Sequence, residues 1–78
     1  MKTIGKVMLK TVNEVKDFVN TVNQCPYEVD LLSGRYVIDA KSLMGIFSLD
    51  LTKPIDLACD PENADDLLSK IDFCVCKE

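Results

Sequence analysis

Four short stretches of the chain alternate between apolar and polar positions, the pattern of β-strands with one buried face. They cover residues 3–9, 27–31, 36–40 and 55–59, and the alternation is least regular in the first. Ser33-Gly34 lies between the second and third stretches, and glycine favours a tight turn. We therefore expect these two strands to form an antiparallel hairpin.

Apolar residues at helical spacing mark a first helix between the first two strands. They recur every three or four positions, at Val12, Val15, Phe18, Val19 and Val22. Thr11 followed by Glu14 is a capping-box pattern, which places the start of the helix after Thr11. Pro26 excludes the residue before it from the α region, so the helix is expected to end near Gln24.

Two further helices are predicted from their start signals. Ser42 is a candidate N-cap for a short helix that reaches about Leu49. Asp60-Pro61-Glu62 combines a capping acid, a proline at the first helical position and an acid in the first turn. The buried face of this last helix is expected to consist of Ala64, Leu67, Leu68 and Ile71.

The predicted order of elements is βαββαβα. It indicates an α+β fold, an open-faced two-layer sandwich in which three helices cover one face of a four-stranded antiparallel sheet. A chain of 78 residues supports one core, so residues 1–78 are interpreted as a single domain. The apolar segment 73–76 has no predicted place in this arrangement.

Composition removes several classes of function. The chain has no histidine, which excludes histidine acid–base catalysis, Ser-His and Cys-His dyads and histidine-ligated metal sites. Nine basic and 13 acidic residues give a net charge of −4, the wrong sign for a nucleic-acid binder. No apolar run approaches the roughly 20 residues that span a membrane. Residues 1–10 lack the apolar core of a signal peptide, so a cytoplasmic location is expected.

The four cysteines are interpreted as free thiols in a reducing compartment. Cys74-Val75-Cys76 is not the C-x-x-C spacing of redox and zinc motifs, and no second pair stands at ligand spacing. We therefore expect neither a metal nor a cofactor.

Residues 39–49, Asp-Ala-Lys-Ser-Leu-Met-Gly-Ile-Phe-Ser-Leu, resemble the segment around the regulatory serine of HPr, the phosphocarrier of the bacterial sugar phosphotransferase system. In that family the segment reads Lys-Ser-Ile/Leu-Met-Gly, one or two residues, and then Ser-Leu-Gly. Here Asp50 replaces the last glycine. Chain length and element order also match, so the resemblance covers nearly the whole chain. It implies an HPr-like fold and makes Ser42 a candidate phosphorylation site for an HPr kinase.

The active-site motif of HPr is missing from this sequence. HPr carries its phosphoryl group on the histidine of a Gly-x-His-Ala-Arg-Pro motif at the start of the first helix. When residues are counted back from Ser42 without gaps, Thr11 occupies the histidine position and Asn13 the arginine position. A phosphothreonine is a stable ester and a poor phosphoryl donor, and a hydroxyl suits the N-cap position. The resemblance therefore implies a degenerate member without catalytic residues, in which Thr11 caps the helix.

Ser42 has two compatible roles, an N-cap and a phosphate acceptor at the positive end of a helix. The short helix after it carries more large apolar residues than one face can bury, so Met44 at least should be exposed. The resemblance implies partner binding here, by Lys41, Leu43, Met44 and Phe47. The alternative is that Leu43, Ile46 and Phe47 belong to the core.

These observations predict a regulatory, protein-binding module rather than an enzyme, linked to sugar transport or carbon catabolite control. Its expected partners are proteins, such as HPr kinase and a transcriptional or transport regulator, with no nucleic acid and no membrane. One alternative is a phosphotransferase-system carrier that uses a residue other than histidine, or a histidine of its partner. Another is a structural module with no signalling role.

Overall fold

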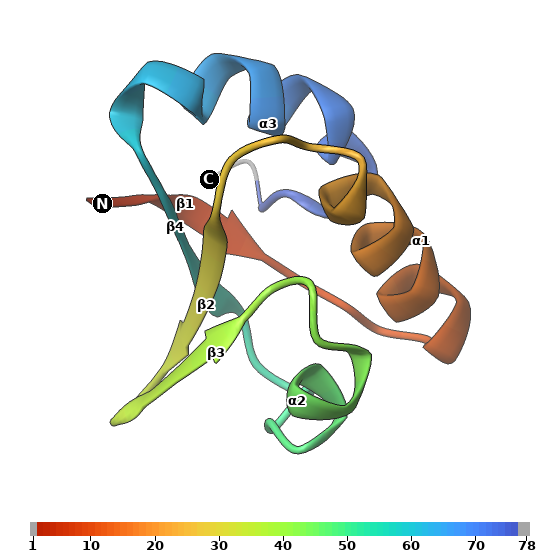
Figure 1. The fold of residues 1–78 in the computed structure, drawn as a ribbon. Coiled ribbons are helices and arrows are strands. Elements are labelled where there is room, and N and C mark those ends of the chain that lie inside the picture. Colours follow the sequence, from red (N-terminus) through yellow and green to blue (C-terminus); the bar gives the residue numbers. More distant parts are fainter. Residues whose placement is uncertain (1, 77–78) are drawn as a thin grey trace.

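The sheet has four antiparallel strands in the order β1-β4-β2-β3 (Figure 1). The computed structural model describes residues 2–76. Its elements are β1 (Lys2–Val7), α1 (Val12–Asn23), β2 (Val29–Ser33), β3 (Tyr36–Asp39), α2 (Leu43–Phe47), β4 (Ile55–Cys59) and α3 (Ala64–Lys70). The helices lie on one side of the sheet, which confirms the predicted open-faced α+β sandwich. No helix in this described range is long and apolar enough to cross a membrane.

β4 is the strand on which the sheet is assembled. It pairs with β1 on one side and with β2 on the other. Its inward row of Ile55, Leu57 and Cys59 is at most 1% exposed. Around this row the core gathers residues from every helix, including Phe18 and Val22 of α1, at 0% exposure. Burial of such side chains contributes roughly 1.5–3 kcal/mol each, so this row and its neighbours supply most of the stability.

The β2–β3 hairpin differs from the prediction by two residues. Its turn consists of Gly34 and Arg35, and Gly34 has a φ of 59°, the conformation that a type II′ turn requires at its first central position. This two-residue turn pairs Ser33 with Tyr36 and so extends β2 to Ser33. The predicted strand over residues 27–31 is therefore displaced to Val29–Ser33, and Tyr27 precedes it.

Two predicted helices begin or end elsewhere. α2 ends at Phe47 rather than Leu49, because the backbone N–H of Ser48 turns back to the carbonyl of Gly45 at 3.2 Å. Asp60 caps a 3₁₀ turn over Pro61–Asn63, and α3 itself begins only at Ala64.

Burial departs from the predicted faces in α1, β3 and α3. Val12 is 56% exposed because it opens α1, ahead of the buried turns. Tyr36 is 68% exposed, although it is in phase with half-buried Ile38, because it lies next to the hairpin turn. In α3 Leu67 is fully buried, whereas Leu68 is only half-buried.

The segment after α3, which had no predicted place, joins the sheet at β1. A 3₁₀ turn over Asp72–Cys74 brings Val75 into an antiparallel bridge with Val7. The carbonyl of Cys74 accepts from the N–H of Met8 at 2.8 Å, and the N–H of Cys76 donates to the carbonyl of Lys6 at 2.9 Å. This segment therefore covers part of the outer edge of β1.

The cysteines are packed as small apolar side chains. Cys25, Cys59 and Cys74 are buried, Cys76 is half-buried, and all four thiols are unpaired. Burial raises the pKa of Cys74 to about 12 and also raises that of Cys59. Since the thiolate is the reactive form, these buried thiols are unreactive at neutral pH.

Close packing between α2 and β3 makes Gly45 a position that does not tolerate a side chain. A Cβ there would lie 2.7 Å from Cγ2 of Ile38 and 3.1 Å from Oγ of Ser42. The Ile38 methyl is attached to a β-branched carbon and has little freedom to move away.

We expect Gly45→Ala to destabilise the fold. Overpacking costs about 1–3 kcal/mol, against the gain of roughly 1 kcal/mol that alanine usually brings inside a helix. Urea unfolding should therefore show a lower midpoint. Gly5→Ala is the matched control, because a Cβ there meets only Cδ2 of Leu68 at 3.9 Å. An equal or higher midpoint for Gly45→Ala would contradict this packing.

We also expect a single thiol to react rapidly in the native protein. At neutral pH a thiol reagent should modify Cys76 first, because the other three cysteines are buried. Denaturant should then expose all four. Cys76→Ser should abolish the fast phase, as followed by mass spectrometry. A fast phase that survives in this variant, or zinc bound stoichiometrically to the purified protein, would show that the thiols have another role.

Candidate functional site

Ser42 stands at the exposed start of α2. Its backbone is extended, and its Oγ accepts a hydrogen bond from the N–H of Gly45 at 3.2 Å. Its own N–H donates to the carbonyl of Asp39 at 2.9 Å, so the residue is fixed between the end of β3 and the helix. The predicted N-cap role of Ser42 is confirmed, and its hydroxyl lies on an exposed residue.

Lys41, which the sequence predicted to bind a partner, has its ammonium group bonded within the protein. Its Nζ donates to the carbonyl of Cys25 at 3.1 Å, just beyond the C-terminal end of α1. The last turn of α1 contains no basic residue of its own, so this ammonium group is favourably placed near the negative end of the helix dipole. Lys41 thus ties the loop before α2 to the end of α1.

The apolar residues of α2 divide between core and surface. Ile46 is fully buried, Leu43 is half-buried, Met44 is 78% exposed and Phe47 is 38% exposed. We call Leu43, Met44 and Phe47 the α2 surface. The prediction that Met44 is exposed is confirmed.

The α2 surface continues into a hollow beside α1. Leu43 lines this hollow together with Lys16, Val19 and Asn20 of α1, and its volume is about 230 Å³. Apolar and polar groups of two helices therefore border one concave surface. The sequence did not predict this hollow, because it depends on how α1 and α2 pack together.

Thr11 caps α1, as predicted. Its Oγ1 accepts from the N–H of Glu14 at 3.1 Å, and Oε1 of Glu14 accepts from the N–H of Lys10 at 3.1 Å. In a capping box the acidic side chain bonds to the N–H of the capping residue itself. Here Glu14 bonds instead to the N–H of Lys10, one residue before Thr11. The protein's own side chains, one of them a carboxylate, occupy the N-terminus of α1, while Asn13 is exposed.

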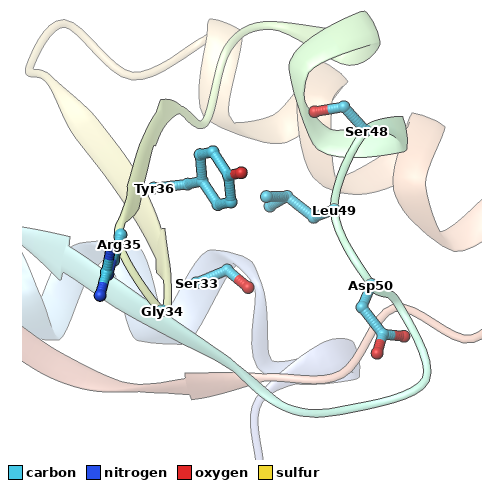
Figure 2. A pocket seen from close by; sticks show the side chains of 7 residues that line it. All are labelled: Ser33, Gly34, Arg35, Tyr36, Ser48, Leu49 and Asp50. Atoms are coloured by element: carbon cyan, nitrogen blue, oxygen red, sulfur yellow. The ribbon is translucent and has the colours of Figure 1, made fainter.

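A second hollow, of about 340 Å³, lies between the β2–β3 turn and the loop after α2 (Figure 2). The ring of Tyr36 points into it toward Leu49, and Asp50 stands at its far side. Hydrogen bonds from the side chain and the backbone of Thr52 lower the pKa of Asp50. The sequence did not predict this hollow, because the turn and the loop are distant along the chain.

Asp66 fixes α3 to the segment before β2. Its Oδ2 accepts from the hydroxyl of Tyr27 at 2.7 Å and from Nζ of Lys70 at 3.0 Å. These two bonds lower the pKa of Asp66, whereas burial, followed by hydrogen bonds with Cys25 and Asp66, raises the pKa of Tyr27. The cluster stabilises the fold and lies on α3, the helix that contributes nothing to the α2 surface.

Neither a family model nor a curated protein matches this sequence. Two solved structures do share its arrangement. HPr-C-His from Thermoanaerobacter tengcongensis is similar with a TM-score of 0.70 at 18% identity, over 92% of this chain and 83% of its own. Crh from Bacillus subtilis, a catabolite repression protein that forms a dimer with a swapped domain, has a TM-score of 0.64 at 24% identity, over 92% and 84%. The chain therefore has the fold of HPr and Crh, as the segment around Ser42 predicted.

Proposed function

We propose that this chain is an HPr-type protein-binding module that has no phosphoryl-carrying histidine and is regulated at Ser42. The observation that supports it best is the position of an exposed capping serine beside the α2 surface. This combination stands in the fold that the chain shares with HPr-C-His and Crh. In this proposal the α2 surface is the docking site for a protein of sugar transport or catabolite control.

The start of α1 argues against phosphoryl transfer by this chain. Histidine is absent, and a phosphohistidine owes its transfer potential to a labile P–N bond. The hydroxyl of Thr11 already accepts a bond from Glu14, whose carboxylate would repel a phosphoryl group at this point. A threonine ester here would be both stable and electrostatically unfavourable. We therefore favour protein binding over phosphoryl transfer through Thr11 as the function of this chain.

Phosphorylation of Ser42 is compatible with the fold. The hydroxyl is exposed and faces the N–H of Gly45, which can donate to a phosphate oxygen in place of Oγ. The new group would bring a charge of about −1.5 to −2 to the start of α2, the helix that carries Met44. Such a charge changes which partner the α2 surface accepts without requiring any element to move.

We expect an HPr kinase from a Gram-positive bacterium to phosphorylate this chain on Ser42. Ser42→Ala should abolish the added mass and lower stability by about 0.5–2 kcal/mol through loss of the cap. Ser42→Asp should retain a capping oxygen and remain folded. Residue-level mass spectrometry identifies the modified position, and thermal unfolding reports the cap.

Authentic HPr, treated in the same tube, is the control for kinase activity. If HPr is modified while Ser42 is not, the regulatory proposal fails and the structural-module alternative is favoured. Phosphoenolpyruvate and Enzyme I should leave the mass of this chain unchanged. An acid-labile phosphate adduct would instead favour the carrier alternative.

We expect Met44→Lys to weaken docking of the kinase and leave the fold intact, because the side chain is 78% exposed. The kcat/KM for modification of Ser42 should fall at least tenfold, in the range of an interface residue worth more than 1 kcal/mol. Phe73→Lys is the matched control, since it adds the same charge at a 50% exposed residue that belongs to the segment after α3. Equal rates for the two variants would exclude the α2 surface as the docking site.

A further inference from the structure

β3 is an edge strand with exposed apolar side chains. It stands last in the strand order, whereas the opposite edge, β1, is partly covered by the segment around Val75. Tyr36 is 68% exposed and Val37 is 64% exposed. Among residues 2–76, Figure 1 shows no other strand beside β3. Proteins usually protect such an edge with charge, a bulge or a covering segment, because it can pair with another strand.

The register with β2 defines which backbone groups of β3 point outward. Ser33 pairs with Tyr36 across the two-residue turn, and the N–H of Ala40 donates to the carbonyl of Val29. In an antiparallel ladder, bonded positions alternate. The N–H groups of Val37 and Asp39 therefore point away from β2, toward the outer edge.

The side chains of β3 and of Arg35, which precedes it, are complementary to the same segment of a second copy. In an antiparallel pair centred on Val37, Arg35 of one copy lies opposite Asp39 of the other, and the reverse holds by symmetry. Val37 then faces Val37, and Tyr36 faces Ile38. Opposite charges and apolar residues in directly opposed positions are the pairs that stabilise sheets.

We propose that β3 pairs antiparallel with β3 of a second copy of this chain, with Val37 on the two-fold axis. The Val37 N–H of each copy donates to the Val37 carbonyl of the other. The Asp39 N–H donates to the Arg35 carbonyl of the second copy, which leaves the Asp39 carbonyl on Ser42. The two sheets join into one of eight strands. This inference is independent of the function proposed above.

The charged residues near the β3 edge favour a second copy of this chain as the partner. Within residues 2–76 the ion pairs are Lys6–Asp56 and Lys70–Asp66, so Arg35 has no acidic partner there.

Acidic residues, in contrast, are in excess beside Asp39. Asp30 lies directly across from it, and Glu28 in turn lies close enough to Asp30 to affect its charge. Burial, then Asp39 and Glu28, raise the pKa of Asp30. A guanidinium of the second copy would offset this repulsion. Oδ1 of Asp39 accepts from the N–H of Lys41 at 2.9 Å, and a carboxylate can accept further bonds.

The test begins with the oligomeric state of the full chain. β3 has only four residues, so the interface is small and the dimer should form at high protein concentration. Sedimentation velocity over a dilution series from micromolar to millimolar should show a reversible monomer–dimer equilibrium. Exchange of the Val37 amide, followed by NMR, should slow as the dimer forms. A wild-type chain that stays monomeric throughout overturns the proposal, whether or not the edge binds a different protein.

Charge exchange between two variants tests the register. Arg35→Glu and Asp39→Lys each place like charges opposite one another in a homodimer, so each alone should be monomeric. Mixed together they restore both opposite-charge pairs and should form a heterodimer. A mixture that stays monomeric while the wild type dimerises overturns the register.

Two further variants distinguish loss of the dimer from loss of folding. Asp39→Lys also removes the hydrogen bond to Lys41, so its circular dichroism must match that of the wild type. If it does not, Val37→Lys decides, because it places two lysines on the two-fold axis and should abolish the dimer. Phe73→Lys is the matched control and should dimerise like the wild type, because Phe73 is 50% exposed and belongs to the segment beside β1, at the opposite edge of the sheet. A Val37→Lys chain that dimerises normally overturns the proposal.

Discussion

The structure depends on the double pairing of β4. β1 and the β2–β3 hairpin do not pair with each other, so only β4 joins them into one sheet. Its inward side chains also form the base on which the helices pack, since Ile55 and Leu57 are at most 1% exposed. The buried side chains of residues 2–76 form one core cluster, so a loss here is not compensated elsewhere in that range. The positions of β3, of α2 and therefore of Ser42 all follow from this central strand.

Close contact between α2 and β3 then determines what the surface can offer. Gly45 lets the helix approach Ile38, and this approach buries Ile46 while leaving Met44 exposed. It also places the Gly45 N–H against Oγ of Ser42. A residue with a side chain at position 45 would disturb the cap and the packing together. The Lys-Ser-Leu-Met-Gly segment thus has a structural reason for its glycine, apart from any regulatory use of its serine.

Patterns in the sequence predicted the order of the strands and helices. They did not predict the surface hollows or the contacts between distant segments. Alternation predicted the strands, and the caps at Thr11 and Ser42 were predicted from hydroxyl residues at the right spacing. The displacement of β2 was not predictable from alternation, because the two-residue turn at Gly34 determines the register. The bond from Lys41 to Cys25 and the bridge from Val75 to Val7 join distant segments, and no periodicity encodes them.

Asp39 lies between the two surfaces for which we propose binding, the outer edge of β3 and the α2 surface. It ends β3, its carbonyl accepts the Ser42 N–H, and its carboxylate accepts the Lys41 N–H. The residue that faces a second copy in one proposal is therefore bonded to the residue that would receive phosphate in the other. Binding at two sites is coupled when both act on one shared element, and the coupling is equal in both directions. In this fold the shared element is the turn from β3 into α2. A phosphate on Ser42 would therefore change the potential at the Asp39 carboxylate, and an Arg35 from a second copy would change it in the opposite sense.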